Sequence, residues 1–69
     1  MTKYEVIIFW SKEDDAFIAQ MPELKGCMAH GDSPDEALKE VYVMADEWLL
    51  LATEKGWHIP EPKGRLHYA

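Results

Sequence analysis

The segment GCMAHGDSPDEAL, Gly26 to Leu38, contains the change from strand to helix that decides the fold. Ser33 has the features of a helix N-cap, because Pro34 follows it at the first helical position and Glu36 stands three residues after it. Acidic residues in a first turn also suit the positive end of the helix dipole. The segment therefore predicts a chain reversal at Gly31 and a helix that begins at Pro34.

The predicted helix runs from Pro34 to about Lys55, and Gly56 is its expected left-handed C-terminal stop. At 1.5 Å per residue, such a helix is roughly 33 Å long. Winding the sequence at 100° per residue places a set of apolar side chains on one broad face, which suits packing on a sheet. These residues are Ala37, Leu38, Val41, Ala45, Trp48, Leu49 and Ala52.

Strands are predicted before this helix. Lys3 to Trp10 is mostly β-branched or aromatic, and Ala16 to Met21 alternates in a similar way after a charged turn, so the two segments predict a hairpin. Pro22 ends the second strand, and Cys27 to His30 is a short apolar third strand. Arg65 to Tyr68 could form a short fourth strand. The predicted fold class is α+β, with a three-stranded antiparallel sheet and one long helix packed on it (β-β-β-α-β).

Length and charge restrict the classes of partner. A chain of 69 residues is enough for one domain, and its formal net charge is -6, with 13 acidic and seven basic side chains. Nucleic-acid binding requires clustered Lys and Arg, so direct binding to DNA or RNA is not expected, and a basic protein is the natural partner. No apolar run approaches the roughly 20 residues that span a bilayer, so we expect a cytoplasmic protein without membrane contact.

A single cysteine, Cys27, rules out an intramolecular disulfide. Small domains without such crosslinks often gain their missing burial by oligomerising. We therefore expect a homo-oligomer, either a dimer or a tetramer.

Candidate catalytic and metal-binding residues are few. Cys27 and His30 have a C-x-x-H spacing, but strand residues three apart point to opposite faces, and no second pair completes a zinc set. Glu13, Asp14 and Asp15 could support metal-dependent hydrolysis only if other carboxylates converged on them, so a solvated hairpin tip is the favoured interpretation. The sequence therefore predicts no catalytic residue, no metal site, no cofactor and no enzyme activity.

The helix face opposite the apolar one is the candidate partner surface. Four glutamates fall there on one arc, beside two aliphatic side chains that lie seven residues apart. The surface comprises Glu36, Glu40, Val43, Glu47, Leu50 and Glu54. A second copy of the chain and a basic partner would both suit it, and the sequence does not decide between them.

Four segments in this order resemble the HicB antitoxin family. They are YEVIIFW (Tyr4 to Trp10), AQMPELKGC (Ala19 to Cys27), GDSPDEA (Gly31 to Ala37) and EKGWHIPEP (Glu54 to Pro62). The resemblance covers nearly the whole chain between residues 4 and 62. It implies a degraded ribonuclease-H-like domain that lacks the catalytic carboxylates of its fold relatives.

The resemblance also implies a function. Members of the family bind a small basic toxin, the HicA messenger-RNA nuclease, and cover its active site, and the net charge of -6 complements such a partner. Many members carry a C-terminal DNA-binding domain, for which residues 1–69 leave no room. We therefore expect residues 1–69 to form a single HicB-like domain without a C-terminal DNA-binding domain.

Two other functions stay open at this point. The missing DNA-binding domain would suit a stand-alone oligomeric scaffold or a small-ligand-binding protein that has no toxin partner. A hydrolase on the nuclease-like fold would depend on Glu13, Asp14 and Asp15 alone.

Overall fold

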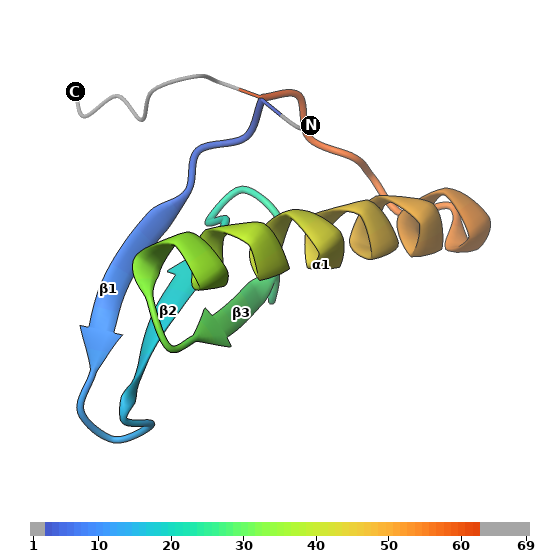
Figure 1. The fold of residues 1–69 in the computed structure, drawn as a ribbon. Helices are drawn as coiled ribbons and strands as arrows, with labels where there is room; N and C mark the ends of the chain where they lie inside the picture. Colours follow the sequence, from blue (N-terminus) through green and yellow to red (C-terminus); the bar gives the residue numbers. More distant parts are fainter. Residues whose placement is uncertain (1–2, 63–69) are drawn as a thin grey trace, which may run out of the picture.

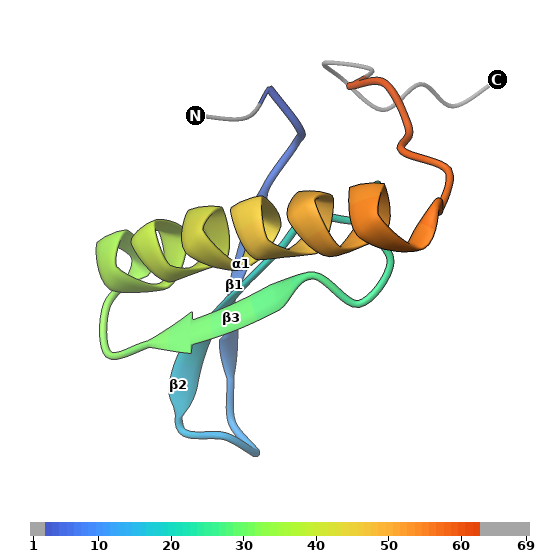
Figure 2. The same ribbon diagram turned by 90° about the vertical axis from the view of Figure 1, so that its right-hand side faces the viewer.

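A computed structural model describes residues 3–62 of the chain (Figure 1). Within these residues lie the strands β1 (Ile7–Ser11), β2 (Ala16–Gln20) and β3 (Met28–Gly31) and the helix α1 (Pro34–Lys55). The strands form an antiparallel sheet in the order β1-β2-β3. Figure 2 shows α1 lying across one face of that sheet. The predicted α+β fold is therefore confirmed.

The strand register divides the side chains of the sheet between two faces. One row across the three strands consists of Trp10, Phe17 and Gly31. The neighbouring row consists of Phe9, Ile18 and His30. Successive side chains of a strand point to opposite faces, and Phe17 packs against the core, so the first row faces α1. The second row lies on the face without the helix, which we call the open face.

The connection between β2 and β3 belongs to the core. The backbone N–H of Met21 donates to the carbonyl oxygen of Cys27 at 3.0 Å, and the N–H of Cys27 donates to that of Leu24 at 2.9 Å. The side chains of all three residues are buried. Buried backbone groups need hydrogen-bond partners, and these two bonds supply them inside the loop.

The helix α1 begins and ends at the predicted residues. Ser33 has extended backbone angles (φ −139°, ψ 161°), and its Oγ accepts a hydrogen bond from the backbone N–H of Glu36 at 3.1 Å. At the other end Gly56 lies in the left-handed region (φ 72°, ψ 25°). The N–H of Trp57 then donates to the carbonyl oxygen of Ala52 at 2.9 Å, which satisfies an acceptor in the last turn.

The apolar face predicted for the helix is the face that packs on the sheet. Its fully buried members are Ala37, Val41, Ala45 and Ala52. Its partly buried members are Leu38, Trp48 and Leu49. Because most of the fully buried side chains are alanines, the helix axis can lie close to the strands.

The strands differ from the prediction at their ends. The first strand begins at Ile7 instead of Lys3. Tyr4 and Val6 precede it but still pack against the core, and the Tyr4 hydroxyl donates a hydrogen bond to the carbonyl oxygen of Pro60. The third strand begins at Met28, one residue later than predicted. The predicted fourth strand, Arg65 to Tyr68, lies outside the described residues.

The helix covers the sheet unevenly. It contacts β3 most extensively, β2 less and β1 least. In both views the end of the β1–β2 hairpin extends beyond the helix (Figures 1 and 2). Ile8 and Trp10, on the face that carries α1, are therefore left partly uncovered. Ile7 and Phe9 are exposed on the open face. This exposure was not predicted from the sequence.

Candidate protein-binding surface

The six residues predicted to meet a partner are all exposed on α1. At 100° per residue they fall within an arc of about 80°, on the side of the helix opposite Val41 and Ala45. From Glu36 to Glu54 the helix rises about 27 Å, at 1.5 Å per residue. We call this set the acidic stripe; its members are Glu36, Glu40, Val43, Glu47, Leu50 and Glu54.

Much of the negative charge of the protein lies on this helix. The sequence of α1 contains six acidic and two basic side chains, a difference of −4, against a formal net charge of -6 for the whole chain. Charges arranged along one exposed element produce a directional field that attracts a cationic partner. The acidic stripe is therefore the part of α1 best suited to such a partner.

Apolar side chains interrupt the acidic stripe. Leu50 is 63% exposed and Val43 is 49% exposed, so each offers a large uncovered aliphatic surface. Met44 and Leu51, at 42% and 40%, are also exposed, one position further along the chain. These two residues were not predicted from the sequence pattern, although each directly follows a predicted one. The exposed apolar surface on α1 is thus wider than the pattern indicated.

An open hollow of about 540 Å³ adjoins the stripe between β3 and the first half of α1. The side chains that line it include Met28, His30, Asp32, Glu36, Glu40 and Met44. It exists because β3 is an edge strand, so no further strand lies beside it in the described sheet. Carboxylates beside two methionines suit a long basic side chain, whose stem is apolar and whose tip is charged.

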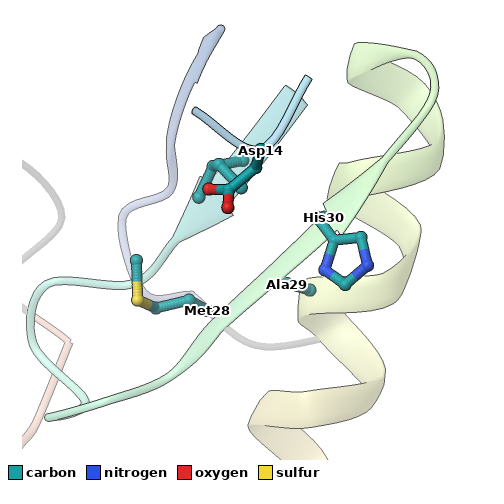
Figure 3. A pocket seen from close by; sticks show the side chains of 5 residues that line it. Asp14, Met28, Ala29 and His30 are labelled. Atoms are coloured by element: carbon teal, nitrogen blue, oxygen red, sulfur yellow. The ribbon is translucent and has the colours of Figure 1, made fainter. Parts of the chain in front are cut away.

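The three consecutive acidic residues of the β1–β2 turn are not joined by other metal-ligating side chains within residues 3–62. Glu13, Asp14 and Asp15 are exposed on the β1–β2 turn, as predicted, and the Ser11 hydroxyl donates to Asp14 Oδ2 at 2.9 Å. Asp14 and His30 both line a hollow of about 360 Å³ at the open face (Figure 3). Across residues 3–62, no three His, Cys, Asp or Glu side chains come close enough to share a metal ion.

Cys27 and His30 point to different environments, as their spacing predicted. The Cys27 side chain is 3% exposed and belongs to the core, whereas His30 is exposed on β3. Burial raises the pKa of the Cys27 thiol above its ordinary value. A raised pKa keeps the thiol protonated at neutral pH, so this cysteine is a poor nucleophile and a poor metal ligand.

A further hollow near the end of α1 is built by aromatic side chains. The rings of Trp48 and Trp57 lie 6.1 Å apart between centroids. Trp48 Nε1 donates to the carbonyl oxygen of Lys25 at 2.9 Å, which ties the helix to the loop before β3. These contacts have a structural role, because they fix the end of the helix against the rest of the fold.

The described residues define a small α+β protein with an exposed acidic helical surface. No helix among residues 3–62 combines the length and the hydropathy needed to cross a membrane. No protein-family model matches the chain, and no solved structure matches it. A UPF0150 protein of Synechocystis sp. is 33% identical to the chain over 57 residues, an alignment that covers 83% of this chain and 77% of that protein.

The chain belongs to the UPF0150 family, a small family that is HicB-like. The resemblance to HicB proteins is thus supported at the level of this small family.

Proposed function

We propose that this protein is a HicB-like antitoxin, or a closely related binding module, that neutralises a small basic messenger-RNA nuclease of HicA type. In this proposal it acts by covering the active site of the nuclease and performs no catalysis itself. The observation that carries the proposal is the acidic stripe, whose six members are all exposed. Membership of a HicB-like family supports it.

The composition of the stripe suits this role. An enzyme that cleaves RNA presents cationic side chains to phosphates, so a row of carboxylates on α1 competes for the same groups. Val43 and Leu50 add apolar contact area. Apolar area buried in an interface contributes more to the binding free energy than exposed charge pairs do. A Lys or Arg of the nuclease can enter the adjoining hollow, where Glu36 and Glu40 offer carboxylates.

The binding test uses the purified protein and the small basic nuclease encoded beside it, or a HicA-type nuclease where no such neighbour exists. We expect a complex that inhibits RNA cleavage and weakens as salt is added, because salt screens exposed charges. Glu47→Lys, in the middle of the stripe, should raise the dissociation constant by roughly tenfold or more.

Glu13→Lys is the matched control, because it makes the same change of charge at the hairpin turn, away from α1. It should leave the dissociation constant close to that of the unchanged protein. An equal loss of binding in both variants would mean that overall charge, and not the acidic stripe, attracts the nuclease. A nuclease that stays active and elutes separately at low salt would contradict the proposal itself.

A second candidate function is a stand-alone oligomeric scaffold or small-ligand-binding protein without a toxin. The observation that favours it is the exposed apolar surface of β1, which a toxin-binding helix does not require. Self-association together with a failure to bind any HicA-type nuclease would support this alternative.

A further inference from the structure

Two tryptophans at the end of α1 form the walls of a hollow, which we call the tryptophan hollow. Its volume is about 470 Å³, and the side chains that line it are Lys25, Trp48, Trp57 and His58. Trp57 is 47% exposed, so much of its ring surface is open to a ligand. Hollows of this size that are lined by aromatic rings and a few polar groups are typical of small-molecule sites.

Hydrogen bonds of the protein itself hold both tryptophans in place. Trp48 is partly buried against the core, and its Nε1 donates to the carbonyl oxygen of Lys25 at 2.9 Å. Trp57 follows Gly56, whose left-handed backbone ends the helix, and its N–H donates to the carbonyl oxygen of Ala52 at 2.9 Å. A site whose walls are already ordered loses little conformational entropy when a ligand binds.

The arrangement of the two rings indicates the shape of the ligand. Their centroids lie 6.1 Å apart, and their planes are tilted by 58°. To hold a third ring between them, they would have to be parallel and at least about 7 Å apart, so they form a corner and not a sandwich. A flat aromatic ring can lie against one wall of this corner with its edge towards the other. The single donor of Trp48 already has an acceptor, so its ring offers the ligand an apolar surface.

Charge indicates which aromatic compounds fit. The hollow at the open face includes Asp14, and the hollow beside the acidic stripe includes Glu36 and Glu40. Among residues 3–62, the side chains that line the tryptophan hollow include no carboxylate. They include instead the ammonium group of Lys25 and the imidazole of His58. In a chain with a net charge of -6, this local reversal of charge favours an anionic ligand.

We propose that the tryptophan hollow binds a small aromatic carboxylate. The ring of the ligand lies against the indole of Trp57, and its carboxylate accepts hydrogen bonds from the Lys25 ammonium group and a ring N–H of His58. A carboxylate fits better than a phosphate ester, because one ammonium group matches a single negative charge and the net charge of -6 repels a second. The proposal does not depend on the antitoxin function, since no residue of the acidic stripe lines this hollow.

The first test adds indole-3-acetate to the whole chain of 69 residues and measures binding by calorimetry and by the indole N–H signals in a nitrogen-15 NMR spectrum. We expect saturable binding that shifts the signals of Trp48 and Trp57. The signal of Trp10, which lies in β1 and does not line the hollow, should stay unchanged. If no binding occurs at millimolar concentrations, for example because another segment of the chain fills the hollow, the proposal is overturned.

Three further compounds separate the contribution of the ring from that of the charge. Indole has the ring without the carboxylate, and acetate has the carboxylate without the ring. Adenosine monophosphate combines an aromatic base with a phosphate. Each should bind several-fold more weakly than indole-3-acetate, and equal or tighter binding of any of them would overturn the assignment of an aromatic carboxylate.

Substitution of Trp57 tests the aromatic wall. Trp57→Leu should raise the dissociation constant of indole-3-acetate by roughly tenfold, the usual effect of losing one stacked ring. Trp57→Phe retains a ring and should lose less affinity. Trp10→Leu is the matched control, because Trp10 is similarly exposed, at 49%, and does not line the hollow. Circular-dichroism spectra like that of the unchanged protein confirm that the variants are folded.

Substitution of Lys25 tests the cationic group. Lys25→Gln removes the ammonium group but keeps the backbone carbonyl that accepts from Trp48, so the hollow should keep its shape. The dissociation constant of indole-3-acetate should rise by up to roughly fivefold, and that of indole should not change. Lys12→Gln, at an exposed lysine of the β1–β2 turn, is the control. Equal effects of a substitution and its control would overturn the proposal, whereas loss of nuclease binding in Glu47→Lys is a separate outcome.

Discussion

At Gly31 the chain turns from β3 towards α1 so closely that a side chain would not fit. A Cβ atom there would lie 2.6 Å from the backbone nitrogen of Ala37 and 2.9 Å from the carbonyl carbon of Glu36. Both atoms belong to the first turn of the helix, which its Ser33 cap holds in place. Relief of the clash therefore requires β3 and α1 to separate.

We expect Gly31→Ala to lower the free energy of unfolding by about 3 kcal/mol, the upper end of the usual cost of overpacking. Gly26→Ala is the control, because Gly26 has a positive φ of 79° but no atom within 4 Å of its added Cβ. That change should cost about 1 kcal/mol, from backbone conformation alone. Urea titrations of both variants measure the difference, and equal losses would contradict the close approach.

The sequence predicted a turn at Gly31, but it did not show why a glycine is required there. Asp32, Ser33 and Pro34 follow it, so a break in the chain was predictable from local pattern. The tight contact with Glu36 and Ala37 depends on the packing of β3 against α1, which no local pattern encodes.

The helix is the element that the sequence predicted best, because its signals are local. Ser33 and Gly56 mark its two ends, and the apolar face between them repeats with the helical period. Strand ends were less predictable: β1 starts at Ile7, although Tyr4 and Val6 continue the same alternation. Strand limits depend on where a partner strand stops, and the register pairs Ile7 with Gln20, the last residue of β2.

Substitution of two valines of α1 tests core packing and partner binding separately. Val41 is fully buried, whereas Val43 is 49% exposed on the acidic stripe. Val41→Ala should lower the free energy of unfolding by about 2 kcal/mol, because it removes buried methyl groups and leaves a cavity.

Val43→Ala should change the stability by less than about 0.5 kcal/mol, the usual limit for surface substitutions. It should instead weaken the binding of a HicA-type nuclease. Urea titration and a binding measurement on both variants test this division. A large loss of stability in Val43→Ala would mean that this side chain is not free for a partner.

At the scale of the whole molecule, the relative width of helix and sheet explains the exposed strand. A helix with its side chains is about 10 Å wide, and strands are spaced at about 4.8 Å, so one helix covers roughly two strands. In this protein those two are β3 and β2. The alternation of residues in β1 shows which side chains share a face. It does not show that the helix α1 fails to cover β1. The exposure of Ile8 and Trp10 was therefore not predictable from the sequence.

Two buried acids link the stability of the whole fold to pH. Burial raises the pKa of the Cys27 thiol. Desolvation raises the pKa of the Tyr4 hydroxyl, and the carboxylates of Glu23 and Glu61 raise it further. Both groups are neutral in the folded state at neutral pH and ionise more readily in the unfolded chain.

A raised pKa in the folded state gives stability that is present below the ordinary pKa and is lost as pH rises through the folded value. The ordinary values are 9.0 for the thiol and 10.0 for the phenol, so the free energy of unfolding should begin to fall above about pH 9. Urea titrations at increasing pH measure this decline.

Tyr4→Phe tests how much of the alkaline decline belongs to Tyr4. The variant loses the hydrogen bond to Pro60 and should be less stable at neutral pH by about 1 kcal/mol. It has no phenol to ionise, so its stability should fall less steeply above the ordinary phenol pKa of 10.0 than that of the unchanged protein. Deprotonation of lysines affects both proteins equally and cancels in the comparison. Parallel declines would show that Tyr4 ionises as readily in the folded protein as in the unfolded chain, contrary to its burial against the core.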